Sequence, residues 1–214
     1  MSVDDHPMSF DERARTWDDD PGKVATAAEV AAAVLGQIDL SGRPRTLELG
    51  AGTGLLSRAL RPHLGPTTLA DSSPGMLEVA RAVIAAQELD GWQAIEVDVD
   101  RDVIPGGPFD LVVAQLAVHH MANPRAVLQQ IHEVLAPGGQ VAIADLDLDP
   151  QGDFHQAHGD FTGHHGFDRE AVTGWLRDLG FVEVAISTAT SITKPSHGQE
   201  QRFPLFLATG RRAS

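Results

Sequence analysis

The feature that most constrains this chain is the octet Leu47–Gly54, an apolar strand with one acid that runs into three alternating glycines. Glycines at positions 50, 52 and 54 allow positive φ values and let a ligand approach the main chain closely. The helical pattern over 55–64 predicts free N–H groups that point back at the bound molecule. The octet therefore predicts a strand–turn–helix unit that binds a polar ligand.

Strand and helix patterns alternate regularly after this octet. Strands are predicted at 45–49, 67–70, 93–97, 109–114 and 140–144, and helices at 55–64, 74–88, 124–135 and 168–180. Two helices are expected ahead of the sheet at 10–18 and 23–37, a long loop at 151–166, and two last strands at 181–187 and 203–209 joined by the polar stretch 188–201. Alternation with strands apolar throughout predicts a parallel sheet with helices on both faces.

Charge and composition narrow the class of partner. The formal charge is −14, with 30 acids against 16 bases, which argues against nucleic-acid binding because that draws on Lys and Arg. Cysteine is absent, which excludes disulfides and thiolate catalysis. The N-terminus lacks an apolar signal region, and no apolar run is long enough to span a bilayer. We expect a cytoplasmic protein that acts on a small molecule, without a membrane or nucleic-acid partner.

Polar residues follow the predicted strands one after another. In a doubly wound sheet, ligands bind beyond the carboxyl ends of the strands. Asp71 ends the second strand about 20 residues after the first glycine, a position that suits a pair of ribose hydroxyls. Asp98 follows the third strand and could accept from an exocyclic amine, with Glu96 and Asp100 as alternatives. The fourth strand leads to the pair His119-His120.

These segments together resemble the class I S-adenosylmethionine-dependent methyltransferases. The resemblance rests on the octet, Asp71–Leu77, Asp98, Phe109–Val113 and Leu135–Gly139, and covers residues 45–145. The segment from His164 through Phe181 is similar to the C-terminal part of small bacterial members. The resemblance implies an α/β fold: a doubly wound, mostly parallel, Rossmann-like sheet of seven strands with helices on both faces and the last strand antiparallel.

The resemblance also implies one domain over 1–214. In it, 1–40 would form an N-terminal helical lid, 45–145 the cofactor-binding core, and 146–167 a loop on the acceptor side. The implied cofactor is S-adenosylmethionine, with S-adenosylhomocysteine as product. The implied cofactor-binding residues are Glu48, Gly50, Ala51, Gly52, Asp71, Ser72, Met76, Asp98, Val99, Ala114 and Gln115.

Each of these positions has an assigned part of the cofactor. The glycine turn and Glu48 would hold the methionine moiety, whose ammonium would meet the backbone at Ala114–Gln115. Asp71 would bind the ribose hydroxyls, Met76 would pack against adenine, and Asp98 with the Val99 N–H would bind the adenine edge. Two structural alternatives stay open, because Asp71 could cap the next turn and Met76 could be a core residue.

The chemistry expected is in-line displacement at the sulfonium methyl, for which the protein aligns the nucleophile and excludes water. His120 and His119 are the candidate bases, with His120 preferred, and their alternative role is to pack the loop. Trp17, His164 and His165 are the expected substrate-binding residues.

No catalytic magnesium site is expected. Metal-dependent catechol-type methyltransferases resemble each other in an Asp after strand four and an Asp-Asn pair after strand five, where this chain has Gln115 and Asp145-Leu146-Asp147. A less favoured alternative is a metal held by His155, His158, His164 and His165 with Asp153 and Asp160.

We therefore expect a metal-independent methyl transfer to oxygen or sulfur of a small molecule, by a monomer or homodimer. One alternative is a non-catalytic protein that senses or sequesters S-adenosylmethionine. Another is an NAD-dependent oxidoreductase. The dinucleotide fingerprint requires a third glycine where this chain has Leu55, and a diphosphate would be repelled by Glu48.

Overall fold

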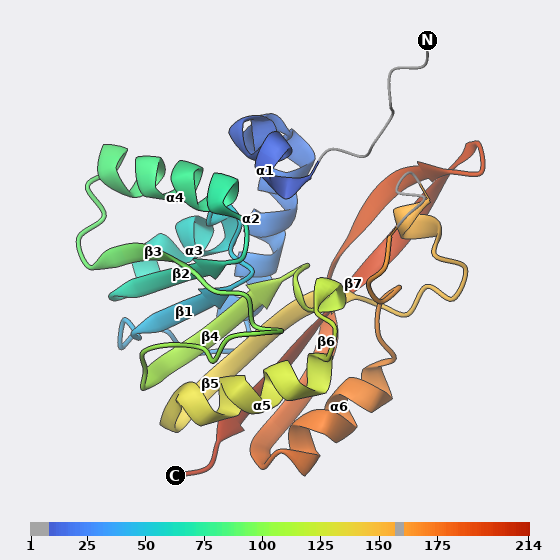
Figure 1. The fold of residues 1–214 in the computed structure, drawn as a ribbon. Helices are drawn as coiled ribbons and strands as arrows, with labels where there is room; N and C mark the ends of the chain where they lie inside the picture. The colour runs from blue at the N-terminus through green and yellow to red at the C-terminus, as the bar shows by residue number, and fades with distance from the viewer. Residues whose placement is uncertain (1–8, 157–160) are drawn as a thin grey trace.

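A computed structural model describes residues 9–156 and 161–214. These residues form one seven-stranded sheet in the order β3-β2-β1-β4-β5-β7-β6 (Figure 1). The strands are β1 Thr46–Leu49, β2 Thr67–Asp71, β3 Trp92–Glu96, β4 Phe109–Gln115, β5 Leu135–Leu146, β6 Phe181–Ser196 and β7 Gln199–Arg212. β1 to β5 pair in parallel, whereas β7 lies antiparallel to both β5 and β6. The predicted sheet, with its last strand antiparallel, is confirmed.

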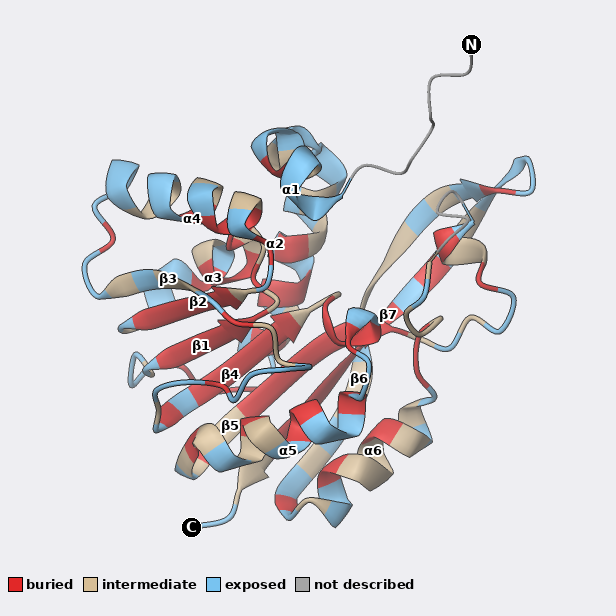
Figure 2. Ribbon diagram, viewed as in Figure 1, coloured by how far each residue is buried: buried red, intermediate tan, exposed pale blue. Residues whose placement is uncertain are grey.

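Helices cover both faces of the sheet (Figure 1). One face carries α2 Pro21–Leu35, α3 Leu55–Leu60 and α4 Pro74–Ala86, and the other carries α5 Pro124–Val134 and α6 Arg169–Asp178. Shorter helical segments are α1 Phe10–Arg13, η1 Ala14–Asp19, η2 Arg61–His63, η3 Val118–His120 and η4 Asp153–His155. In Figure 2 the sheet is largely buried while the outward helix faces are exposed, as expected of a sheet covered on both sides.

Side-chain caps fix where three of the helices begin. Ser73 accepts a hydrogen bond from the Met76 N–H at 3.2 Å, and Asn123 accepts from the Ala126 N–H at 3.1 Å. Both caps are followed by proline at the first helical position, whose fixed φ suits a helix start. Asp168 caps α6 by accepting from the Ala171 N–H at 2.9 Å, without a proline after it. The local sequence thus determines where each helix leaves the carboxyl edge of the sheet.

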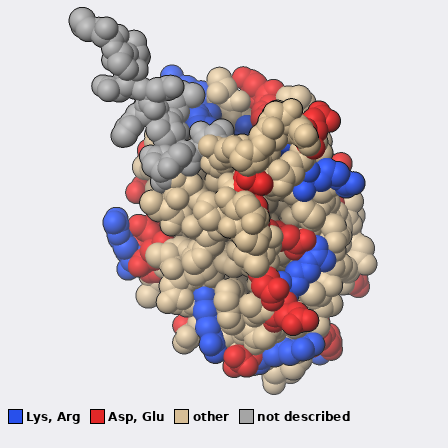
Figure 3. All heavy atoms as spheres, turned by 90° about the vertical axis from the view of Figure 1, so that its right-hand side faces the viewer, with Lys and Arg blue, Asp and Glu red and all other residues tan. Residues whose placement is uncertain are grey.

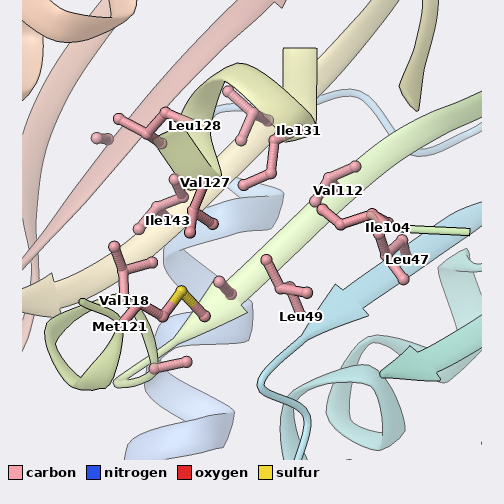
Figure 4. Packing of buried hydrophobic residues seen from close by; sticks show 14 of the residues in the cluster. Leu47, Leu49, Ile104, Val112, Val118, Met121, Val127, Leu128, Ile131 and Ile143 are labelled. Carbon is pink, nitrogen blue, oxygen red and sulfur yellow. The ribbon is translucent and has the colours of Figure 1, made fainter. Parts of the chain in front are cut away.

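The core alternates residue by residue along the strands. In β4, Val112 faces the α5 side whereas Leu111 and Val113 face the α2–α3 side. Figure 4 shows Val127 and Ile131 of α5 pointing at the sheet among such residues. Burial of an apolar side chain of this size contributes about 1.5–3 kcal/mol, so this packing holds the strand ends at fixed positions.

The C-terminal strands differ from their predicted bounds. β6 and β7 run through the predicted polar connection 188–201 as one long hairpin that turns at His197-Gly198. Thr, Ser and Gln dominate this stretch and most of its residues are partly exposed, so it lacks the apolar alternation from which a strand is predicted. The projecting hairpin packs beside the predicted loop, where η4 lies within 151–166.

Several other bounds also shift. β5 begins at Leu135 instead of 140, because the chain passes from α5 directly into the strand. The helix predicted over 55–64 ends its α-helical part at Leu60 and continues as the 3-10 helix η2. The helix predicted over 10–18 divides into α1 and η1.

Candidate active site

The glycine turn joins β1 to α3 at the carboxyl edge of the sheet. Gly50 has a φ of +63° and Gly54 a φ of +82°. A Cβ on Gly50 would lie 2.3 Å from the Ala117 Cβ, and one on Gly54 would lie 2.7 Å from Leu69. Both glycines are therefore required by backbone conformation and by close packing. The turn is tied to β2 by the Ala51 N–H, which donates to the Ala70 carbonyl at 3.0 Å.

Glu48 is buried beneath this turn. Its side chain accepts a hydrogen bond from the Ser57 N–H in the first turn of α3 at 2.9 Å. Burial raises the pKa of Glu48 to about 7, and the hydrogen bonding of Ser57 and the charge of Arg58 offset only part of that effect. The carboxyl group thus links β1 to α3 and titrates near neutral pH.

Asp71 ends β2 and faces the turn from the next strand. Its carboxylate accepts from the Gly52 N–H at 2.7 Å and from the Ser73 N–H at 2.8 Å. Burial raises the pKa of Asp71, with backbone hydrogen bonds acting in the opposite direction. Each carboxylate oxygen has a second lone pair, so Asp71 can still accept from a ligand. Ser72 is exposed beside it, and Met76 is buried below Gly52.

Asp98 and Val99 follow β3. Asp98 accepts from the Asp100 N–H at 3.1 Å and lies 3.4 Å from Arg101, and its side chain is partly exposed. The Val99 carbonyl accepts from the Gln130 side chain at 3.2 Å, which ties this loop to α5. The Val97 N–H donates to the Asp71 carbonyl at 2.9 Å, so the loop lies beside the end of β2. The residues predicted to bind ribose (Asp71) and adenine (Asp98 and Val99) are therefore neighbours.

Ala114 and Gln115 end β4 and lie next to β5. Ala114 is buried, and Gln115 pairs in register with Ala144. The Oε1 atom of Gln115 is buried and has no hydrogen-bond partner. A buried acceptor of this kind costs about 1–3 kcal/mol unless a donor reaches it, so it marks a place where a ligand donor fits.

His119 in η3 forms a buried pair with Asp145 of β5. Its Nδ1 lies 2.6 Å from the Asp145 Oδ1, and both side chains are almost fully buried. The Asp145 carboxylate also accepts from the His119 N–H at 3.2 Å and from the Leu146 N–H at 2.8 Å. Asp145 is surrounded by donors, so we assign the imidazole proton to Nδ1, which leaves the lone pair on Nε2. Sequence reasoning missed this role of Asp145, although an acid that ends the strand beside His119 was a usable signal.

Aromatic and imidazole rings from three separate segments gather around this pair. We call the following set the ring cluster: Phe10, Trp17, His119, His120, Phe154, His155, Phe161 and His165. Exposed His120 lies 4.1 Å from His119 and 5.3 Å from Phe10 between ring centroids. His155 stacks face to face on Phe161 at 3.6 Å. Burial, followed by the neighbouring histidines, lowers the pKa of His155 to about 3, so it is neutral at physiological pH.

The three predicted substrate-binding residues occupy different places. Trp17 and His165 belong to the ring cluster, 5.8 Å from Phe10 and 5.5 Å from His155 respectively. The His164 ring instead contacts Phe167, while its backbone N–H donates to the His119 carbonyl at 2.7 Å. The structure thus brings Trp17 and His165 together with the histidine pair, and uses His164 to hold the loop.

The N-terminal segment crosses the same edge of the sheet above the turn. Asp18 of η1 accepts from Thr53 Oγ1 at 2.6 Å and pairs with Arg58 at 2.5 Å. Asp11 of α1 accepts from Ser73 Oγ at 2.5 Å and from the Gly75 N–H at 2.8 Å. The two acids therefore fasten α1 and η1 to both sides of the site.

Two open surface hollows are lined by residues outside the predicted site. One, of about 290 Å³, is lined by residues such as Asp39, Asp110 and Gly138 at the opposite edge of the sheet. The other, of about 490 Å³, lies beside β6 and contains Arg169 and Arg202. The predicted site residues lie instead at the strand ends, beside the N-terminal segment and the ring cluster.

Comparison with known proteins agrees with this arrangement. The sequence profile of a family described as a methyltransferase domain matches residues 47–141, from β1 into β5. The matched region, residues 47–141, is similar to the class I S-adenosylmethionine-dependent methyltransferases. The matched region contains every predicted cofactor-binding residue, from Glu48 to Gln115.

Individual relatives show how far the similarity extends. The chain is 36% identical over 151 residues to the biotin biosynthesis bifunctional protein BioCD of Bordetella avium, covering 70% of this chain and 32% of that protein. It is 33% identical over 106 residues to a demethylmenaquinone methyltransferase of Clavibacter sepedonicus, covering 50% and 42% respectively. The chain therefore spans less than half the length of both curated relatives.

A solved structure shows the same fold. The putative methyltransferase of Haloferax volcanii, in complex with the Trm112 methyltransferase activator, superposes with a TM-score of 0.78 at 22% identity, covering 96% of this chain and 98% of that one. The methyltransferase fold therefore extends across nearly the whole chain.

The hydrogen-bond acceptors present fit the cofactor that the family implies. A carboxylate with spare lone pairs at Asp71 suits ribose hydroxyls, and the unpartnered Gln115 Oε1 suits an ammonium donor. Within residues 9–156 and 161–214, no three His, Asp or Glu side chains are grouped to hold a metal ion. Two members of the alternative metal set, His158 and Asp160, lie outside the described residues.

Two surface properties bear on the predicted partners. Among the described residues, no helix combines the length and apolar character needed to cross a membrane. On the face drawn in Figure 3, outside the grey atoms, Lys and Arg side chains lie next to Asp and Glu side chains. Ion pairs between such side chains include Arg211–Glu183 and Arg169–Asp147. That face therefore offers no broad basic patch of the kind that binds nucleic acid.

Proposed function

We propose that this chain transfers the methyl group of S-adenosylmethionine to an oxygen or sulfur of a small-molecule acceptor, without a metal. The observation that carries the proposal is the His119–Asp145 pair at the ends of adjacent strands. It lies beside the strand ends that carry the predicted cofactor-binding residues. The family supports a methyl donor at this edge, and the pair supplies a base where the acceptor would enter.

The cofactor would be held by groups from four strand ends. Glu48 and the glycine turn would face its methionine moiety, and Gln115 Oε1 would accept from the ammonium. Asp71 would accept from the ribose hydroxyls, and the loop at Asp98 and Val99 would face adenine. Met76 lies below the turn, where it packs Gly52. When bound, S-adenosylmethionine supplies an already activated methyl group.

His119 would remove the proton of the acceptor hydroxyl or thiol at Nε2 as the acceptor oxygen or sulfur gains the methyl group. The imidazole then carries two protons and one positive charge, which the ionised Asp145 stabilises through Nδ1. Asp145 thus holds the base in the productive tautomer. His119 is only 2% exposed beneath the ring cluster, so the acceptor must displace a ring to reach Nε2. This would exclude water during transfer.

A ring carbon is a second candidate acceptor atom. The relative from Clavibacter sepedonicus is named a demethylmenaquinone methyltransferase, and the ring cluster offers flat faces on which a ring could stack. Removal of a ring hydroxyl proton by His119 would also raise the electron density on the adjacent carbon. The mass and proton spectrum of the methylated product would distinguish a new C–CH3 group from O–CH3 or S–CH3.

The activity test compares variants of the pair with a matched histidine control. His119→Asn should lower kcat by about 10²–10⁴-fold while the affinity for S-adenosylmethionine, measured by calorimetry, stays within about threefold. Asp145→Asn should lower kcat with a changed pH profile, and His120→Asn should have a much smaller effect. The assay is release of S-adenosylhomocysteine with a panel of phenols, thiols and hydroquinones.

Two results would argue against the proposal. Tight cofactor binding with no turnover on any acceptor would favour the non-catalytic binding protein. Unchanged turnover in His119→Asn would show that His119 is not the base.

We also propose that the protein acts in the cytoplasm as a monomer or homodimer, without nucleic acid. The charge of −14 and the mixed surface of Figure 3 support this proposal. The Haloferax volcanii neighbour forms a complex with an activator, so the test must also detect a complex with another protein. Light scattering of the purified chain gives its oligomeric state, and a heterocomplex isolated from the native source would contradict it.

A further inference from the structure

The chain contains only two lysines, and both lie at the ring cluster together with Arg13. The Lys23 Nζ lies 4.5 Å from the centre of the Trp17 ring, and the Arg13 guanidinium lies 4.9 Å from it. Lys194, from the hairpin, lies 3.6 Å from the centre of the Phe154 ring and donates to the Phe154 carbonyl at 3.2 Å. Three rings of the cluster, Phe10, Trp17 and Phe154, thus lie against cations from opposite ends of the chain.

Contacts between α2 and β6 bring these cations together. Gln37, just beyond the end of α2, donates to Ser187 at 2.6 Å, and Glu29 in its middle accepts from Thr190. The two segments therefore run side by side, and the beginning of α2 at Lys23 approaches β6 near Lys194. The pKa of Lys194 is lowered by burial first, and then by the positive charges of Arg13 and Lys23. That influence agrees with their closeness.

Only one of these three cations is found in an ion pair among the described residues. Lys23 pairs with Asp20 at 2.7 Å. No ion pair found within residues 9–156 and 161–214 includes Arg13 or Lys194. The chain has 30 acids and 16 bases, so acidic partners for its cations are abundant. An anion that binds between Arg13 and Lys194 would neutralise charge that no ion pair among the described residues takes up.

The same cluster contains buried hydrogen-bonding atoms without a partner. The Nδ1 atoms of His155 and His165 are buried and unbonded. His155 is 6% exposed, and its ring lies between Phe154 and Phe161. Unsatisfied buried nitrogens of this kind are uncommon and mark a place where a polar ligand fits. The rings, the free nitrogens and the excess cations thus share one location.

We infer that the methyl acceptor is an anion: a molecule with a flat apolar body and a carboxylate or phosphate group. The body would lie among the rings of the cluster, and the anionic group would be bound by Arg13 and Lys194, with Lys23 beside them. This inference rests on the proposed function only in taking the ring cluster as the acceptor side.

Ligand binding tests this inference without requiring turnover. Para-hydroxybenzoate, its neutral amide para-hydroxybenzamide and phenyl phosphate would each be titrated by calorimetry into the protein saturated with S-adenosylhomocysteine. We expect at least one anion to bind about tenfold or more tightly than the amide, the ratio worth about 1.4 kcal/mol. The order of the two anions distinguishes a carboxylate from a phosphate group. An amide that binds as well as both anions, or no binding by any of the three, would overturn the inference.

Variants locate the anion. Arg13→Gln combined with Lys194→Gln should abolish the preference for the anion over the amide, while the affinity for the amide stays within about twofold. Arg13→Gln alone is compared with Arg15→Gln as the matched control, since Arg15 is exposed on the same segment and its replacement removes the same charge. An equal loss in Arg15→Gln would show a general charge effect and overturn the assignment of the site.

Lysine modification gives a second readout. Acetylation of Lys194, followed by peptide mass spectrometry, should slow at least about threefold in the presence of the tighter-binding anion but not with the amide. Lys23 and Lys194 are the two lysines of the chain, so the acetylation of their two peptides can be compared directly. Equal acetylation with and without the anion would contradict contact with Lys194. Loss of methyl transfer alone would contradict the proposed function and leave these binding results unaffected.

Discussion

Replacing Glu48 by glutamine should make the stability of the protein less dependent on pH. The carboxyl group is 3% exposed and accepts from the Ser57 N–H at 2.9 Å. Its pKa in the folded chain is about 7, against 4.5 for the ordinary value. Glutamine has nearly the same shape and keeps an oxygen that can accept from Ser57, but it cannot ionise.

The sign follows from proton binding in the two states. Between these two pKa values the folded chain binds the proton and the unfolded chain does not, so stability falls as the pH rises. A shift of that size corresponds to a loss of about 2.5 kcal/mol from about pH 5 to about pH 8. Glu48→Gln removes this loss. The free energy of unfolding of the variant, relative to the wild type, should therefore rise by about 2–3 kcal/mol over the same pH range.

Urea denaturation at several pH values measures this difference. With a denaturant slope of about 2–3 kcal/mol per molar, the midpoint of Glu48→Gln relative to the wild type should shift by about 1 M. Glu78→Gln, on the exposed face of α4, is the control and should follow the wild type at every pH. A difference between Glu48→Gln and the wild type that stays constant within about 0.5 kcal/mol would refute the reasoning, because Glu48 would then not titrate in this range.

Three further changes test other parts of the structure. His155→Phe should resist acid better than the wild type. Because the pKa of His155 is about 3, the folded wild type loses stability as the pH falls from about 6.5 towards that value. Thermal melting across this range measures the loss, and an equal loss in His155→Phe would contradict the prediction. Gly50→Ala should cost about 2–4 kcal/mol and weaken cofactor binding, because its Cβ would lie 2.3 Å from the Ala117 Cβ at a φ of +63°. Gly174→Ala in α6, where nothing lies within 4 Å of an added Cβ, should raise stability by about 0.5–1 kcal/mol, and a loss of stability there would contradict the helix packing.

Much of the part of the fold predicted to bind the cofactor, from β1 to β5, could be predicted because its sequence patterns are local. The glycine turn, the cap at Ser73 with its proline, and the cap at Asn123 each specify structure within a few residues. Buried parallel strands are continuous apolar runs, which locate them in the sequence. The structure confirms the sheet from β1 to β5 on this basis, with small shifts at the ends of the elements.

The acceptor side could not be predicted in the same way because its contacts are long-range. Phe10, His119, His155 and Lys194 come from four distant segments, and their meeting depends on how the lid and the hairpin pack. The polar hairpin has no apolar alternation to indicate that it is a strand. Asp145 was considered only in weighing a magnesium site, whereas the structure pairs it with His119. That pairing follows from the order β4-β5 in the sheet.

Calorimetric titration with S-adenosylmethionine and NAD is the decisive experiment for the site at the strand ends. S-adenosylmethionine should bind at one site, NAD should not bind, and Asp71→Asn should weaken the affinity about tenfold or more while the exposed Asp90→Asn should not. Binding of NAD, or equal affinity of Asp71→Asn and the wild type for S-adenosylmethionine, would contradict the assignment.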